Sequence, residues 1–69
     1  MFNAKAFRRA VEDSNLTLSD IADKLGISKA TLYRKINGKS DFYRSEIQII
    51  AQAIGEDKIF DIFFSSKVA

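Results

Sequence analysis

Apolar residues recur at helical spacing along most of this chain, in stretches separated by glycines and short polar runs. Leu18, Ile21, Ala22 and Leu25 fall at positions i, i+3, i+4 and i+7, which lie on one face of a helix. Gly26 follows directly, where a chain that ends a helix and turns sharply needs a residue that tolerates positive φ. The pattern therefore predicts a short amphipathic helix that ends in a tight turn.

A second amphipathic helix is predicted directly after this turn, from about Lys29 to Ile36. Ser28 is placed to cap it, and Leu32 and Ile36 fall on its inward side. Two helices joined by so short a turn cross at a steep angle, as they do in a helix-turn-helix. We therefore assign a helix-turn-helix motif to about residues 17–38.

Three further helices are predicted around the motif, each from a cap residue and an apolar stripe. Their bounds are about residues 4–14 with Asn3 as the cap, 44–54 with Gly55 at the end, and 57–64 with Asp57 as the cap. Residues 65–69 are expected to form a frayed tail. The fold class is thus all-α, a compact bundle of about five short helices in one domain, residues 1–69.

The last of these helices is apolar on more than one side. One face takes Ile59, Phe60 and Phe63, which leaves Ile62 and Phe64 over. Large apolar side chains left over on a small domain commonly mark an interface. The alternative is that all five residues are needed to close a small core.

The composition argues against catalysis. The chain has neither Cys nor His, so a thiolate metal site, the commonest general base and a common metal ligand are all missing. We therefore expect no enzyme activity, no metal and no cofactor. The absence of Cys, of an apolar signal-peptide run and of a membrane-spanning stretch favours a cytoplasmic protein.

Positive charge is concentrated on one segment. The net charge of the chain is only +2, but residues 28–44 contain five basic residues against one acidic residue, Asp41. The rest of the chain contains six basic and eight acidic residues. A cationic surface on and after the second motif helix is suited to meeting phosphate groups, although a solvated cationic face has the same composition.

The motif resembles the Cro/repressor-type helix-turn-helix family, the small regulators typical of temperate phages. The resemblance rests on Thr17, Ile21-Ala22, Leu25-Gly26-Ile27, Leu32 and Asn37-Gly38-Lys39. It implies a lambda-repressor-like DNA-binding fold in which the second motif helix lies in the major groove. Because a helix-turn-helix also serves as a plain packing motif, the resemblance specifies the fold more closely than it specifies DNA binding.

The resemblance also implies which side chains face a partner. The positions expected to face base edges are Ser28, Lys29, Ala30, Tyr33 and Arg34, and those expected to contact phosphate are Thr17, Asn37, Lys39 and Arg44. Lys29 and Arg34 suit the acceptor edge of guanine. Two positions depart from the family: Leu18 stands where a polar DNA contact is common, and Lys35 stands where an apolar residue is common.

Two functions follow, and the sequence leaves both open. The first is a regulator of the lysis–lysogeny type that binds double-stranded operator DNA, with two copies about one DNA turn apart if it dimerises. The second is an antirepressor that binds a phage repressor's DNA-binding domain through Tyr33 and Arg34, or through Leu18, Ile62 and Phe64. The operator, the sign of regulation and the choice between monomer and homodimer are not encoded in any motif we identify.

Overall fold

The computed structural model describes residues 2–64, and all of their regular structure is helical. The elements are α1 (Ala4–Asp13), α2 (Leu18–Leu25), α3 (Lys29–Ile36), α4 (Arg44–Ile54), a 3₁₀-helix η1 (Glu56–Lys58) and a π-helix η2 (Phe60–Phe64). The predicted all-α class is confirmed. No helix in this part of the chain is long and apolar enough to cross a membrane. The predicted tail, residues 65–69, lies outside the described residues, as does residue 1.

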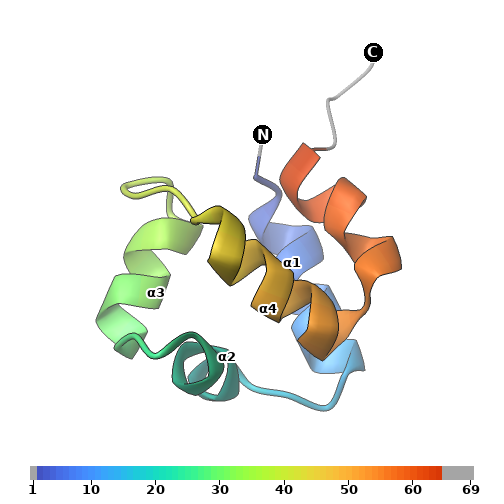
Figure 1. Cartoon of the computed structure of the whole chain (residues 1–69), viewed down its shortest axis with the longest axis horizontal. Helices are drawn as coiled ribbons and strands as arrows, with labels where there is room; N and C mark the ends of the chain where they lie inside the picture. The colour runs from blue at the N-terminus through green and yellow to red at the C-terminus, as the bar shows by residue number, and fades with distance from the viewer. Residues whose placement is uncertain (1, 65–69) are drawn as a thin grey trace.

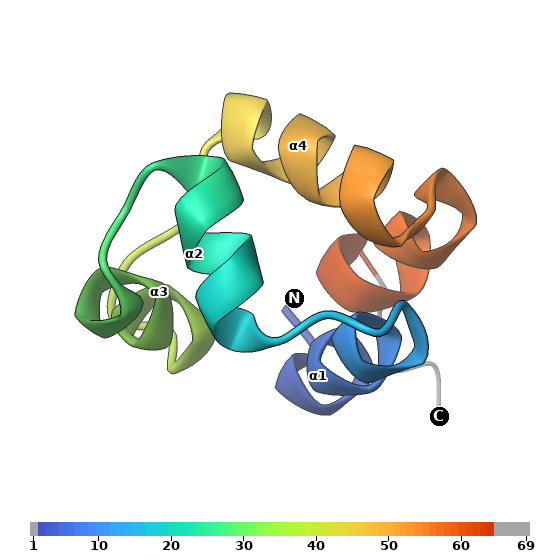
Figure 2. The same cartoon turned by 90° about the horizontal axis from the view of Figure 1, so that it is seen from below.

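Figures 1 and 2 show how the helices are arranged. The α2 and α3 helices form one end of the molecule, α4 crosses over α2, and the C-terminal turns lie beside α1. The start of α1 is tied to these turns by a hydrogen bond of 2.7 Å from the Asn3 N–H to the Ile62 carbonyl. The two ends of the described chain are therefore in contact with each other, and α3 lies at the edge of the molecule, away from them (Figures 1 and 2).

The predicted starts of the first three helices are confirmed. The side chains of Asn3 and Ser28 each accept a hydrogen bond from the backbone N–H three residues later, at 3.0 and 3.1 Å. Thr17 and Asp20 form a reciprocal capping box, as their spacing predicts. These bonds satisfy N–H groups that have no partner within the helix, so the positions of the helix starts follow from local sequence.

The turn between α2 and α3 depends on Gly26, which adopts the left-handed conformation with φ 71°. The next amide, that of Ile27, donates to the Ala22 carbonyl at 3.0 Å and closes the end of α2. Ala22 is itself buried. A left-handed residue directly after the helix reverses the chain within three residues, and this brings α3 against α2.

The core is formed by the inward faces of α1, α2, α3, α4 and η2. Its buried members are Phe7, Ala10, Val11, Ile21, Ala22, Leu32, Ile36, Ile50, Ile54, Ile62 and Phe63. The rings of Phe2, Phe7, Phe42 and Phe63 cluster at one end of this core, with centroids 5.1 to 6.1 Å apart. These separations are typical of packed aromatic rings.

The C-terminal segment differs from the single capped helix predicted for residues 57–64. Gly55, with φ 107°, precedes η1, and Asp57 lies inside that 3₁₀ turn rather than capping a helix. Ile62 is only 1% exposed, whereas Phe60 is 65% exposed, so the prediction placed both on the wrong side. The wider π turn aligns Ile62 and Phe63 toward α1, which an α-helical face of Ile59, Phe60 and Phe63 does not do.

Candidate nucleic-acid interface

The outward side of α3 is exposed. Leu32 and Ile36 are buried against α2 and the core, and this orients the helix. The exposed positions include all five that the sequence predicts to face base edges: Ser28, Lys29, Ala30, Tyr33 and Arg34. The structure thus brings these residues onto one accessible ridge, at the N-terminal end and along the free face of the helix.

The polar groups on this ridge differ in their availability. The Ser28 hydroxyl caps α3 and also donates to the Thr31 hydroxyl at 3.0 Å, so part of its hydrogen-bonding capacity is used. The side chains of Lys29 and Arg34 form no hydrogen bond or ion pair with any residue between 2 and 64. Two unpaired cations on an exposed helix are therefore free to bind acceptor groups of a partner.

The loop after α3 folds back onto that helix. Gly38 has φ 84°, and the next amide, that of Lys39, donates to the Arg34 carbonyl at 2.8 Å. Asn37 closes the end of α3, and both it and Lys39 are exposed. Arg44, exposed at the first position of α4, follows the loop. The N-terminus of a helix repels a cation, so the helix dipole does not favour Arg44 at this position.

Lys35 belongs to the interior and not to the ridge. Its Nζ lies 3.2 Å from Oε1 of Glu46 on α4, and the two side chains are 5% and 9% exposed. The register of α3 is therefore the predicted one, since Ile36 is buried beside it. We did not predict a role for Glu46, although a Glu at the third position of a helix is the residue that accepts from the N-cap N–H, as Glu46 does from Tyr43.

Thr17 is exposed at the start of α2 and forms the capping box with Asp20. Its N–H donates to Oδ2 of Asp20 at 2.8 Å, and its hydroxyl accepts from the Asp20 N–H at 3.1 Å. First the backbone N–H and then the side chain of Thr17 hold the pKa of Asp20 below its ordinary value of 3.8, with a smaller contribution from Lys24. The Thr17 hydroxyl accepts in this bond, so its proton is still available to a phosphate oxygen.

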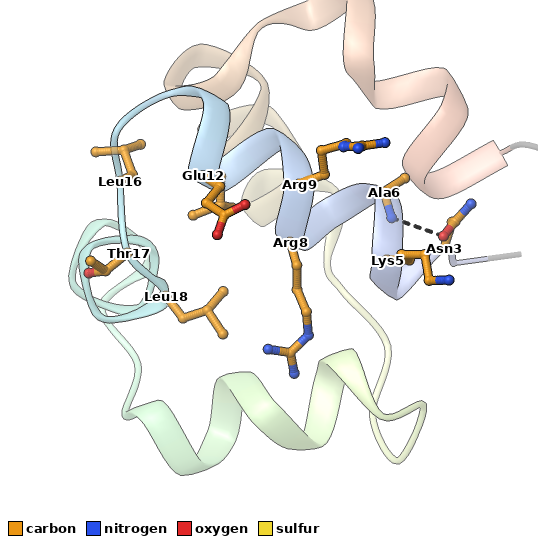
Figure 3. A pocket seen from close by; sticks show the side chains of 10 residues that line it. Asn3, Lys5, Ala6, Arg8, Arg9, Glu12, Leu16, Thr17 and Leu18 are labelled. Carbon is orange, nitrogen blue, oxygen red and sulfur yellow. Dashed lines mark hydrogen bonds between the residues drawn. The ribbon is translucent and has the colours of Figure 1, made fainter.

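A groove runs between α1 and the start of α2, with a volume of about 980 Å³ (Figure 3). Its lining consists of Asn3, Lys5, Ala6, Arg8, Arg9, Val11, Glu12, Leu16, Thr17 and Leu18. Arg8 extends beside Leu18 in the direction of α3, whereas Arg9 extends another way (Figure 3). The Arg8 side chain has no hydrogen-bond or ion-pair partner in the described part of the chain.

The residues predicted for a protein interface do not lie together. Leu18 is half-buried and packs at the edge of the core, and Ile62 is buried inside it. Phe64 is 56% exposed, and its ring lies 6.4 Å from that of the exposed Phe60. Ile62 is therefore excluded from any surface role, and the exposed apolar pair at this end is Phe60 and Phe64.

A pair of packed helices joined by a tight turn, with unpaired cations on the exposed side of the second helix, is the arrangement found in DNA-binding helix-turn-helix domains. Comparison with protein families agrees: residues 7–58 match the helix-turn-helix family model. The chain therefore belongs to the family of Cro/repressor-type helix-turn-helix regulators, whose members are DNA-binding transcription regulators and not enzymes. No significant match is found among curated proteins or among solved structures.

Proposed function

We propose that this protein is an operator-binding regulator in a switch of the lysis–lysogeny type, and that α3 reads the operator from the major groove. The observation that carries the proposal is the α3 ridge, on which Lys29 and Arg34 are exposed and unpaired. Guanine O6 and N7 are the base-edge acceptors that such cations bind. The ridge holds no acidic side chain that would repel DNA.

Phosphate contacts on either side of the ridge hold α3 in the groove. Lys39 and Arg44 act on one side, with Asn37 at the end of α3. Thr17 acts on the other side, and Arg8 joins it across the groove of α1. Such contacts fix the register of the protein on the duplex without reading sequence.

Two copies bind a near-palindromic site in this proposal, with recognition helices about 34 Å apart. Homodimerisation on DNA doubles the number of base contacts that one short helix supplies. Sedimentation at micromolar concentration, with and without an operator duplex, measures the assembly. A strict monomer that binds one half-site would contradict this part of the proposal and leave DNA recognition intact.

Selection from a random duplex library, followed by titration of the enriched sequence, tests the function directly. We expect one enriched motif, bound at least about 10³-fold more tightly than random duplex at physiological salt. Binding should weaken steeply as salt rises, because each neutralised phosphate releases a counterion. No enrichment over random duplex would overturn the proposal.

A second candidate function is an antirepressor that binds the DNA-binding domain of a phage repressor. The observation that favours it is the exposed pair Phe60 and Phe64, together with Tyr33, which is 40% exposed beside Arg34. Aromatic and arginine side chains are enriched at the energetic centres of protein interfaces. A gel-shift titration of the repressor's operator complex separates the two functions: an antirepressor releases repressor while binding no DNA itself.

A further inference from the structure

Lys35 is a charged residue of α3 that is buried, and its burial needs a physical reason. A lysine at the interface between two helices loses hydration that only close partners replace. An apolar side chain would fill the same space without this cost. The groups that contact the Lys35 ammonium therefore indicate which structural role the charge has.

Four groups surround the Lys35 ammonium, and all come from residues 41–46, in the loop after α3 and the first turn of α4. Its Nζ donates to the Asp41 carbonyl at 2.9 Å and pairs with Oε1 of Glu46 at 3.2 Å. The Tyr43 ring covers it, with the centroid 4.4 Å from Nζ, and the centroid of the Phe42 ring lies 5.8 Å from the same atom. A single cation thus binds a backbone carbonyl, a carboxylate and an aromatic face, which matches the donor capacity of an ammonium.

The Glu46 carboxylate connects the Lys35 ammonium to the backbone of the loop. The Glu46 atom that pairs with Lys35, Oε1, also accepts a hydrogen bond from the Tyr43 N–H at 2.8 Å. The two side chains therefore hold both the residue before Phe42 and the residue after it. At its other end the loop is held to α3 by the bond from the Lys39 N–H to the Arg34 carbonyl. Residues 37–43 are thereby anchored at both ends.

We infer that Lys35 is a positioning residue for DNA binding: through Asp41, Tyr43 and Glu46 it sets the shape of the loop that presents Lys39 and Arg44 beside α3. Lys35 does not itself reach the partner, because its side chain is buried. The inference rests on the proposed function, since Lys39 and Arg44 matter here as phosphate contacts. Without the ion pair, the loop must be ordered during binding, and ordering opposes affinity.

The double variant Lys35→Met with Glu46→Gln tests this inference. It removes both buried charges, so the net charge stays at +2 and long-range attraction to DNA is unchanged. Glutamine also keeps an acceptor for the Tyr43 N–H, so the start of α4 remains capped. Met has a volume and flexibility that suit the vacated space. The double variant therefore removes the ion pair between Lys35 and Glu46 without changing the net charge or the cap of α4.

We expect the double variant to bind both the selected duplex and random duplex about tenfold more weakly, after correction for the folded fraction. Hydrogen exchange in the free protein should quicken at the Gly38 and Lys39 amides and remain unchanged in α1. A purely structural role predicts unchanged corrected affinity and unchanged exchange in the loop. That result would overturn the inference while the wild type still binds its operator.

Glu46→Gln alone gives a second reading if the double variant folds poorly. It leaves the Asp41 carbonyl on Lys35 but removes the counter-charge, and it raises the net charge from +2 to +3, which by itself strengthens attraction to DNA. The deciding readout for this variant is therefore hydrogen exchange in the free protein: an intermediate quickening at the Gly38 and Lys39 amides is expected, and unchanged exchange there would overturn the inference. A wild type that binds no DNA contradicts the proposed function itself, and the two failures are thereby distinct.

Discussion

The ring of Phe42 meets the ring of Phe63 edge to face, with centroids 5.3 Å apart and planes at 87°. Phe42 belongs to the loop that follows α3, and Phe63 belongs to the last turn of the described chain. This contact joins the loop after α3 to the C-terminal segment. The stability of the loop therefore depends on how that segment is packed.

Replacing Phe63 and Phe60 tests the packing of this segment with one type of substitution. Phe63→Ala removes a buried ring from the aromatic cluster, and we expect a loss of about 3–5 kcal/mol in the free energy of unfolding. Phe60→Ala removes a ring that is exposed, and we expect a change within about 0.5 kcal/mol. Urea unfolding followed by circular dichroism measures both. Equal losses for the two variants would contradict the orientation of η2.

Replacing Arg34 and Lys39 separates base recognition from phosphate contact. Arg34→Ala should relax preference at one base pair, at about 1–3 kcal/mol of discrimination if the contact to guanine is bidentate. Lys39→Ala should weaken all sequences alike and reduce the salt slope by about one. Titration of each variant against duplexes with single base-pair changes gives the comparison. Our assignment of Arg34 to a base fails if its removal weakens every duplex equally.

Two neighbouring arginines of α1 allow a controlled test of whether the groove between α1 and α2 contacts DNA. Arg8 extends beside Leu18 toward α3 and Arg9 does not (Figure 3), while both carry the same charge and both are exposed. Arg8→Ala should reduce affinity for all duplexes and lower the salt slope by about one, as expected for one lost phosphate contact. Arg9→Ala controls for the change in net charge. Identical salt slopes for the two variants would remove α1 from the DNA-binding surface.

The capping box makes stability depend on pH in the acid range. Hydrogen bonds from Thr17 lower the pKa of Asp20, so the ionised carboxylate stabilises the folded state more than the unfolded state. This stabilisation is fully present above the ordinary pKa of 3.8 and is lost as pH falls through the lowered value. Asp20→Asn keeps an acceptor for the Thr17 N–H but cannot ionise.

The melting temperatures of the wild type and the Asp20→Asn variant give the measurement. The wild type should melt at the higher temperature near neutral pH, and the gap should narrow as pH falls below about 4. A gap that stays constant across that range would show that the Asp20 charge contributes nothing to the cap.

What the sequence determined by itself is local. Asn3, Thr17 and Ser28 cap helices because each bonds to an amide three residues away. Gly26 ends α2 because glycine adopts positive φ without steric cost. The outward ridge of α3 followed from the spacing of Leu32 and Ile36. Interactions within one turn of a helix involve residues that are close together in the sequence, so they could be predicted without knowledge of the rest of the chain.

What only the tertiary structure decided depends on residues that are distant in sequence or on a segment without a polar side. In residues 57–64 the five apolar side chains fall on more than one side of a helix, so periodicity gave no single orientation. Packing against α1 places Ile62 and Phe63 in the core and leaves Phe60 exposed. Lys35 is a surface residue by type, and it is buried because α4 brings Glu46 within 3.2 Å. Burial of a charge is decided by the partner that neutralises it, and here that partner comes from another helix.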